Sequence, residues 1–152
     1  MTNKNRFGRT ILINKKCMAY FIKTIWGPGG QYGFPENGEM NFANKRMKKR
    51  CEKFAGQNKF LVYETGHKDK RNVGAKSVYA QGIVLSNKCE MLKNREIGVY
   101  IKITKRVNPK NGIKLGIVRK IINRQNMQAP GGLIEITKEQ FNKLSAELEK
   151  CY

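Results

Sequence analysis

The chain has 152 residues, a length that suits one domain with a single substantial core. Hydrophobic residues make up 39% of it, which excludes an intrinsically disordered chain, and no apolar run approaches the ~20 residues of a membrane-spanning helix. The 31 Lys and Arg residues against 11 Asp and Glu residues give a net charge of +20, which favours a polyanionic partner, nucleic acid above all.

A membrane partner and a coding bias would each account for some of the positive charge. An acidic membrane surface would attract it, but no basic amphipathic helix with a broad apolar face stands free to bind one. A coding bias towards Lys, Asn and Ile would produce part of the charge, but not the shortage of acidic residues. We therefore expect a nucleic-acid partner, DNA or RNA, and no membrane partner.

Residues 1–17 form a basic arm with no acidic residue, ahead of a domain at 18–152. We interpret the arm as loosely held, with its apolar stretch at 11–13 available to add a short edge strand. No apolar segment with a small-residue cleavage site follows the arm. We therefore expect a cytoplasmic protein without a secretory signal.

The cysteines and the single histidine do not match a zinc site, which takes four ligands that usually come in close pairs. We expect reduced thiols, no metal and no cofactor. The cysteines are Cys17, Cys51, Cys89 and Cys151, and the histidine is His67.

The segment at 19–25, AYFIKTI, is rich in residues that favour strands and predicts the first core strand. A glycine-rich loop follows at 25–38, IWGPGGQYGFPENG, and contains the only tryptophan, Trp26. Trp26 either packs into the core or presents its ring to a ligand. The loop lacks the Lys-Ser/Thr ending of a phosphate-binding loop, so we interpret its glycines as permitting tight turns and close approach to a ligand.

The segment at 41–56 predicts a helix that Asn41 caps and Gly56 ends. Its apolar residues recur at steps of four, four and three, which makes one buried stripe. Basic residues occupy most of the other positions, against one acidic residue, and we interpret them as a surface that faces phosphates. They are Lys45, Arg46, Lys48, Lys49, Arg50 and Lys53.

Three further strands are predicted at 58–66, 77–85 and 97–107, with a loop at 67–76. Gly82, inside the second of these strands, indicates a bend.

The C-terminal part predicts a short helix at 115–123, a turn, a last strand at 133–136 and a final helix. Thr137 and Gln140 make a capping box for the final helix. The stretch from 97 to 134 contains no acidic residue. Five or six strands with two or three helices, arriving without βαβ alternation, predict an α+β fold: a small, curved, mixed or antiparallel sheet that closes towards a barrel and is flanked by helices.

Three stretches in this order resemble the EVE domains of the PUA-like superfamily, which are relatives of YTH and ASCH domains. The first strand ends in Trp26, a helix leads into KFLVYETG, and the chain closes with GIKLGIVRKIINRQNMQAPGGLIEITKEQFNKLSAEL. The resemblance covers residues 18–150 and implies a pseudo-barrel that holds one flipped-out, often modified base in an aromatic-lined pocket. The chain departs from YTH cages in having a single Trp, so Tyr or Phe would supply the other wall. NFANKR, at 41–46, only partly matches the segment that some EVE proteins have near that place.

Binding a base takes flat aromatic faces, polar groups for the base edge and cations for the phosphates. Each aromatic residue taken singly also suits the core, and Asn41 suits a helix cap better than a base edge. The aromatic candidates are Trp26, Tyr32, Phe34, Tyr63 and Tyr79; the candidates for the base edge are Glu64, Thr65 and Gln81; the candidates for phosphate are Lys45, Arg46, Lys49 and Arg71.

The leading hypothesis is a non-catalytic, monomeric reader of a base in DNA or RNA. The resemblance also admits a small ASCH-like hydrolase of modified nucleosides, in which Lys23, Thr24 and Glu64 would supply the nucleophile and the acid–base groups. A generic RNA-binding protein, for which charge alone would serve, is the third hypothesis. Clustered carboxylates for a nuclease metal are missing from the sequence.

Overall fold

A computed structural model describes residues 2–4, 10–12, 17–25, 38–42, 45–69, 72–93 and 95–152. Within these ranges it gives the backbone alone for 2–4, 10–12, 45, 67–69 and 72–73.

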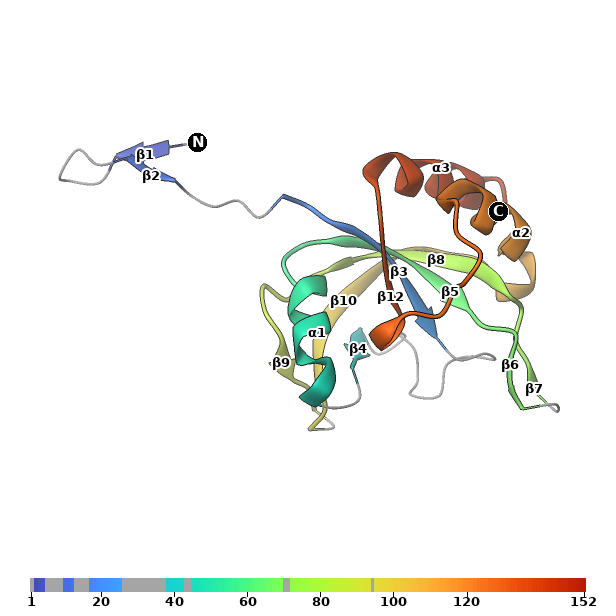
Figure 1. Ribbon diagram of the computed structural model, residues 1–152, viewed down its shortest axis with the longest axis horizontal. Helices are drawn as coiled ribbons and strands as arrows, with labels where there is room; N and C mark the ends of the chain where they lie inside the picture. Colours follow the sequence, from blue (N-terminus) through green and yellow to red (C-terminus); the bar gives the residue numbers. More distant parts are fainter. Residues whose placement is uncertain are drawn as a thin grey trace.

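The centre of the molecule is a mixed, curled half-barrel sheet (Figure 1). Its strands lie in the order β12-β3-β5-β8-β10-β4, and β11 and β9 pair with β8 and β10 off this path. Among the strands that the structure describes in this sheet, β3 and β5 run parallel and the other pairs are antiparallel. The strands are β3 (Tyr20–Ile25), β4 (Glu39–Asn41), β5 (Lys59–Glu64), β8 (Ser77–Val84), β9 (Glu90–Met91), β10 (Ile97–Arg106), β11 (Ile113–Lys114) and β12 (Leu133–Ile136).

Three α-helices in the described part of the chain accompany the sheet, and the predicted α+β class with a small curved mixed sheet is confirmed. In Figure 1, α1 lies beside β9 and β10, whereas α2 and α3 gather together near the C-terminus. The helices are α1 (Lys48–Phe54), α2 (Leu115–Ile122) and α3 (Lys138–Glu149), and the 3₁₀ turns are η1 (Lys45–Met47), η2 (Pro109–Asn111) and η3 (Pro130–Gly132).

The helices pack on opposite faces of the strands. On β3, Phe21 contacts Phe54 of α1, with ring centroids 5.6 Å apart. Its neighbour Tyr20 contacts Phe141 of α3, at 5.1 Å. Because successive residues of a strand point to opposite faces, α1 covers one face of β3 and α3 covers the other.

The predicted cap of the first helix is wrong. Asn41 lies in β4, where it pairs with Gly98 of β10, and the helix begins after Met47 with no side-chain cap. The end of the helix is secured instead by the fully buried Asn58, whose Nδ2 donates to the carbonyls of Phe54 and Ala55 at 2.9 and 3.1 Å. Pairing with β10 outweighs the preference of Asn for a cap, because it satisfies backbone groups along the whole segment.

The predicted capping box of the last helix is confirmed. The Thr137 hydroxyl accepts from the Gln140 N–H at 3.1 Å, and the Gln140 side chain accepts from the Thr137 N–H at 2.9 Å.

The two strands of the arm, β1 (Thr2–Lys4) and β2 (Thr10–Leu12), pair with each other and not with the main sheet. The prediction of a loop at 67–76 is wrong in part, because this segment contains a short hairpin. Its strands are β6 (His67–Asp69) and β7 (Asn72–Val73).

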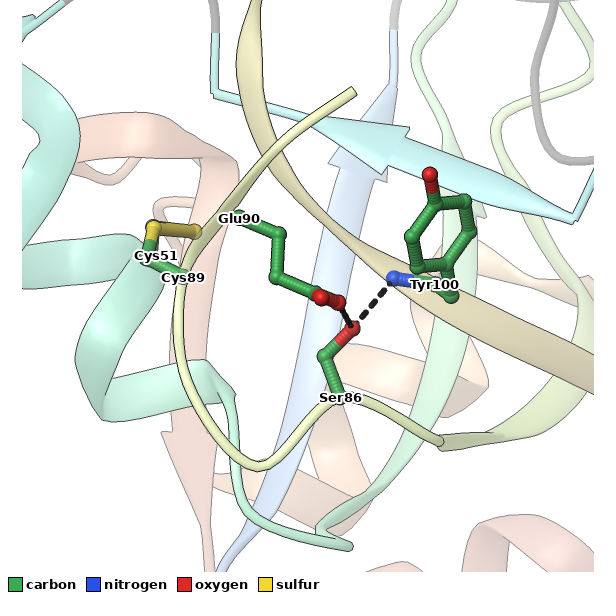
Figure 2. The surroundings of a disulfide bond; sticks show 5 residues. All are labelled: Cys51, Ser86, Cys89, Glu90 and Tyr100. Carbon is green, nitrogen blue, oxygen red and sulfur yellow. Dashed lines mark hydrogen bonds between the residues drawn. A yellow bond between two sulfur atoms is a disulfide. The ribbon is translucent and has the colours of Figure 1, made fainter. Parts of the chain in front are cut away.

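A disulfide joins Cys51 of α1 to Cys89, in the connection between β8 and β9 (Figure 2). The expectation of reduced thiols is therefore wrong for these two cysteines. In the same connection, the Ser86 hydroxyl donates to the Glu90 carboxylate and accepts from the Tyr100 N–H at 2.8 Å. The disulfide and these hydrogen bonds fix α1 and the connection to the sheet.

Candidate nucleic-acid interface

The site begins where the parallel strands β3 and β5 end. Ile25 pairs with Glu64, and the Thr65 N–H donates to the Ile25 carbonyl at 3.0 Å. The glycine-rich loop therefore leaves the sheet beside Glu64 and Thr65, two of the predicted base-edge residues. The predicted aromatic residues of the loop, Trp26, Tyr32 and Phe34, lie outside the described residues.

Lys23 is buried two residues before this end of β3, with 8% of its surface exposed. Its Nζ donates to the Gly131 carbonyl and lies 4.6 Å from the centroid of the Phe42 ring. Desolvation by burial lowers the pKa of Lys23 to about 8. The lysine is thus a cation held between a carbonyl and an aromatic face, with part of its hydration removed.

The PGG turn of η3 brings its backbone against Lys23. Gly131 and Gly132 have φ angles of +66° and +67°, which favour glycine. A Cβ on Gly132 would lie 2.6 Å from the Thr24 carbonyl oxygen and 3.1 Å from Lys23 Nζ. A Cβ on Gly131 would lie 3.4 Å from Arg50 of α1. The turn therefore lies between the buried lysine and the basic helix.

Glu64 lies on the same face of the sheet as Lys23. Lys23 pairs with Val62 and Ile25 pairs with Glu64, and paired residues of neighbouring strands share a face. Glu64 has 2% of its surface exposed, and its carboxylate accepts from the Ala75 N–H at 2.9 Å. Lys23 and Glu64, two buried residues of opposite formal charge, therefore lie near the same end of the sheet, on the face that α1 covers.

Tyr63 lies on the opposite face from Glu64. It pairs with Thr24, whose hydroxyl donates to the Met127 carbonyl at 3.4 Å. Burial raises the pKa of Tyr63, and the guanidinium of Arg119, on α2, opposes that rise. The structure therefore does not bring Tyr63 together with Glu64.

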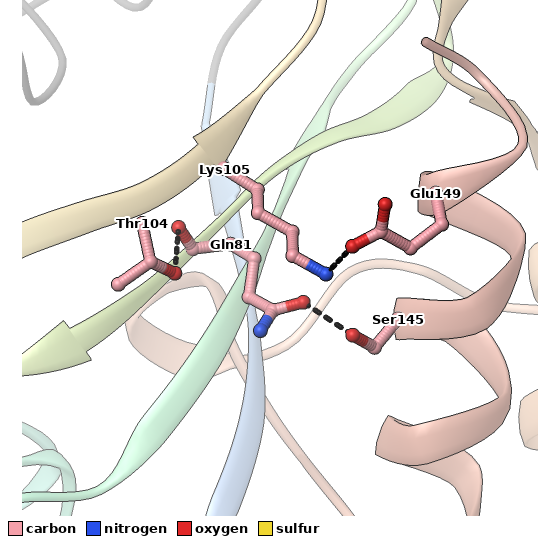
Figure 3. A network of polar contacts seen from close by, with 5 residues as sticks. All are labelled: Gln81, Thr104, Lys105, Ser145 and Glu149. Atoms are coloured by element: carbon pink, nitrogen blue, oxygen red, sulfur yellow. Dashed lines mark hydrogen bonds and ion pairs between the residues drawn. The ribbon is translucent and has the colours of Figure 1, made fainter.

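Gln81 also faces the α2–α3 side. Its side-chain oxygen accepts from the Ser145 hydroxyl of α3 at 2.7 Å, and its backbone carbonyl accepts from Thr104 at 3.2 Å (Figure 3). Beside it, Lys105 forms an ion pair with Glu149 of α3. The Gln81 side chain thus ties β8 to α3, away from Lys23.

Tyr79 is an additional residue of β8 at a register shift. Val62 pairs with Ala80 and Tyr63 with Val78, so the register of β5 on β8 shifts by one residue at Tyr79. The ring is 2% exposed, and the guanidinium carbon of Arg106 lies 5.9 Å from its centroid. Tyr79 belongs to the hydrophobic core.

The predicted phosphate surface is a row of exposed basic side chains on and before α1. Arg46 and Lys49 are exposed, Arg71 lies outside the described residues, and the side chain of Lys45 is not described. Arg50, another exposed basic residue of α1, lies beside the PGG turn. The other exposed basic residues of α1 are Lys48 and Lys53, and Lys53 forms an ion pair with Glu135 at 2.8 Å.

The sequence prediction did not include Phe42 in the site, and it named Arg50 only as part of the basic surface of the helix. The PGG turn, which follows a segment without acidic residues, offered a signal for both, because a turn of two glycines marks a close backbone approach. Lys23, expected only for the hydrolase hypothesis, was marked by its position inside an otherwise apolar strand.

This arrangement of sheet and helices is the PUA-like fold, and similar solved structures include a YTH domain. The Mmi1 YTH domain has a TM-score of 0.58 and 14% identity, over 97% of this chain and 91% of its own. A hypothetical protein from Leishmania major has a TM-score of 0.57 and 11% identity, over 88% and 96% of the two chains. Rpa0253 from Rhodopseudomonas palustris has a TM-score of 0.54 and 12% identity, over 88% and 94%. No protein-family model matches the sequence, and neither does any curated protein.

None of the helices in the described ranges is long and apolar enough to cross a membrane.

Proposed function

We propose that this protein is a non-catalytic nucleic-acid-binding domain of the EVE type. It recognises one flipped-out, modified base at the end of β3 and β5, in a pocket that Trp26 and its loop help to form. The observation that carries the proposal is the contact of the PGG turn with both Lys23 and Arg50, because it joins the buried end of the sheet to the basic helix α1.

The energetics of base recognition fit this arrangement. Extruding a base from a duplex costs a few kcal/mol, and stacking on an aromatic residue returns about 1–3 kcal/mol per base. Exposed cations on α1 would hold the adjoining phosphates, and the net charge of +20 would draw the polyanion to the protein. The likeness to the Mmi1 YTH domain supports the same class of ligand.

A binding screen tests the proposal. Oligonucleotides, single- and double-stranded, would carry methylated or hydroxymethylated bases at one position, and affinity would be measured by fluorescence anisotropy at several salt concentrations. We expect salt-sensitive binding that one modification improves. Trp26→Ala should weaken that complex about tenfold, the loss of one good stacking contact, and leave a weak non-specific component.

The matched control is Tyr152→Ala, which removes an aromatic ring that is exposed after α3. It should leave the affinity unchanged. Binding that depends on salt but not on modification or on Trp26 would contradict the proposal and favour a generic RNA- or DNA-coating protein.

The buried Lys23 favours a second candidate function, hydrolysis of modified nucleosides. A lysine whose pKa is lowered to about 8 by burial is partly neutral near physiological pH and is a better nucleophile than an exposed one. Incubating the protein with modified nucleosides, with and without divalent metal, tests it. Turnover that is lost in Lys23→Ala would replace the non-catalytic proposal, and absence of turnover would leave it standing.

A further inference from the structure

The end of α2 carries a second group of basic side chains, separate from those of α1. Lys120 and Arg124 are exposed and Arg119 is half-buried, and no carboxylate among the described residues forms an ion pair with any of the three. The helix α3 begins beside this end of α2, but the acidic residue of its first turn, Glu139, pairs with Lys143 instead. The described part of the chain therefore leaves this positive charge unbalanced, which favours a counter-charge from outside.

Hydrogen bonds to the segment after α2 hold the two guanidinium groups in place. Arg119 Nε donates to the Gln125 carbonyl at 2.9 Å, and Arg124 Nη2 donates to the Gln128 carbonyl at 3.1 Å. Of the five N–H donors of a guanidinium, these bonds and that of Arg124 Nε to the Asn126 carbonyl use one on Arg119 and two on Arg124. The other donors suit phosphate oxygens, and side chains already held lose less entropy when they bind.

The segment at 123–132 leads from these arginines to α1 and contains no acidic residue. On the face that α3 covers, the Met127 carbonyl accepts from the Thr24 hydroxyl. On the face that α1 covers, the Gly131 carbonyl accepts from Lys23, and a Cβ on Gly131 would lie 3.4 Å from Arg50. The segment therefore crosses the end of β3 from one face of the sheet to the other, and Figure 1 shows it in orange, running from α2 towards β12.

We propose that Arg119, Lys120 and Arg124 form a second phosphate-binding surface, the α2 surface, and that one nucleic-acid strand runs from it over the segment at 123–132 onto α1. This inference rests on the proposed function for the contacts of α1, and it extends the path of the strand to the other face of the sheet.

The length of the segment limits the length of strand that is needed. Seven residue steps separate Arg124 from Gly131, which at ~3.6 Å per residue span at most about 25 Å. Phosphates along one strand of a duplex are ~3.4 Å apart, so about eight nucleotides reach both surfaces. A single-stranded oligonucleotide of about ten nucleotides should then contact the α2 surface and α1 at once.

The test measures the affinity of such an oligonucleotide, with the preferred base at its centre, by fluorescence anisotropy at several salt concentrations. Lys120→Gln with Arg124→Gln should lower the slope of log K against log salt concentration by about two, one for each phosphate contact. Adding Lys48→Gln and Lys49→Gln to this double variant should lower the slope by about four in all. An unchanged slope in the α2 double variant would overturn the inference.

The matched control is Lys88→Gln with Lys93→Gln, which removes the same charge from exposed positions beside β9, on the other side of the molecule from α2 (Figure 1). Its slope should stay near that of the wild type. Arg124→Lys, which keeps the charge, should also keep the slope. If the α2 double variant does not fold, Lys120→Gln alone decides, because Lys120 makes no hydrogen bond or ion pair within the described part of the chain; its slope should fall by about one.

The stoichiometry tests whether the two surfaces bind one strand. Titration at protein concentrations well above Kd should end at one oligonucleotide of about ten nucleotides per protein. Two oligonucleotides per protein would overturn the single path, because each surface would then bind its own strand.

The outcomes separate the inference from the proposed function. A slope that falls in the α1 double variant but not in the α2 double variant overturns the inference alone. Binding in which both surfaces contribute but no base or modification is preferred overturns the proposed function and supports the inference.

Discussion

At the scale of single residues, the strongest constraints on the site come from atoms in close contact around Lys23. Gly132 approaches the backbone of β3 so closely that any side chain would collide with the Thr24 carbonyl. The alternation of a strand decides which candidates belong together, since Tyr63 and Glu64 are neighbours in sequence and therefore face opposite sides of β5. That separation could be predicted from the sequence. The contact of the PGG turn with Lys23 could not, because 108 residues separate Lys23 from Gly131.

Gly132→Ala should destabilise the fold. The new Cβ would lie 2.6 Å from a carbonyl oxygen at a residue with φ of +67°, so strain and overpacking together should lower the free energy of unfolding by about 2–4 kcal/mol. Gly116→Ala is the control, because a Cβ at that helical position would meet nothing within 4 Å. It should be neutral or stabilising by up to about 1 kcal/mol. Urea unfolding of both variants measures the difference, and equal stabilities would contradict the close approach.

Lys23 should make stability depend on pH. Its pKa of about 8 in the folded protein lies below the ordinary value of 10.5, so between these values the unfolded chain binds more protons than the folded one. Its contribution to the free energy of unfolding therefore rises with pH across this interval, by up to about 3 kcal/mol. The advantage of Lys23→Met over the wild type, measured by urea unfolding, should shrink by this amount from pH 8 to pH 10.5. A constant difference would show that Lys23 titrates normally.

At the scale of elements, local sequence patterns predicted the long strands and the last helix. They did not predict the elements whose hydrogen bonds or packing depend on residues distant in sequence. The capping box predicted α3, and runs of apolar and β-branched residues predicted the long strands, β3, β5, β8, β10 and β12. The strands β4, β9 and β11 have three residues or fewer and exist because longer strands supply their hydrogen bonds, so no local pattern marks them. The helix α1 shows the same dependence. It has seven residues and no side-chain cap at its start, and Asn58 and the disulfide hold it in place.

Reducing the disulfide should destabilise the protein. Cys51 and Cys89 are 38 residues apart, and opening a loop of that length costs about 2–4 kcal/mol in the free energy of unfolding. Denaturant unfolding with and without reductant, or of Cys89→Ser, would measure this loss. Cys151→Ser, at a free and partly exposed cysteine, should change little. Mass spectrometry that finds both thiols free in the purified, unreduced protein would refute the pairing.

At the scale of the whole molecule, the four acidic residues that follow residue 134 all form ion pairs. The basic excess is therefore left on α1 and on the stretch from 97 to 134, which contains no acidic residue. The ion pairs that involve β12 and α3 are Lys53–Glu135, Lys105–Glu149, Lys143–Glu139 and Lys150–Glu147.

The salt dependence of binding should locate the nucleic acid. Each phosphate contact that is lost lowers the slope of log K against log salt concentration by about one, so Lys48→Gln with Lys49→Gln should lower it by about two. The matched double variant replaces Lys138 and Lys143 of α3 with Gln, which removes the same charge from another surface. Its slope should stay near that of the wild type. Equal slopes for the two double variants would exclude α1 as the phosphate surface.

The parallel pairing of β3 with β5 bears on how binding specificity can change. Parallel neighbours cannot be joined by a hairpin, so the chain must cross over between them, and residues 26–58 make that crossing. The crossing contains both Trp26 and α1, and thus the proposed stacking residue and the proposed phosphate contacts. The candidates for the base edge, Glu64 and Thr65, lie outside this stretch, as does most of the sheet ladder. Exchanging residues 26–58 in a chimera would therefore change the stacking and phosphate contacts together, while the half-barrel and its base-edge candidates are retained as the scaffold.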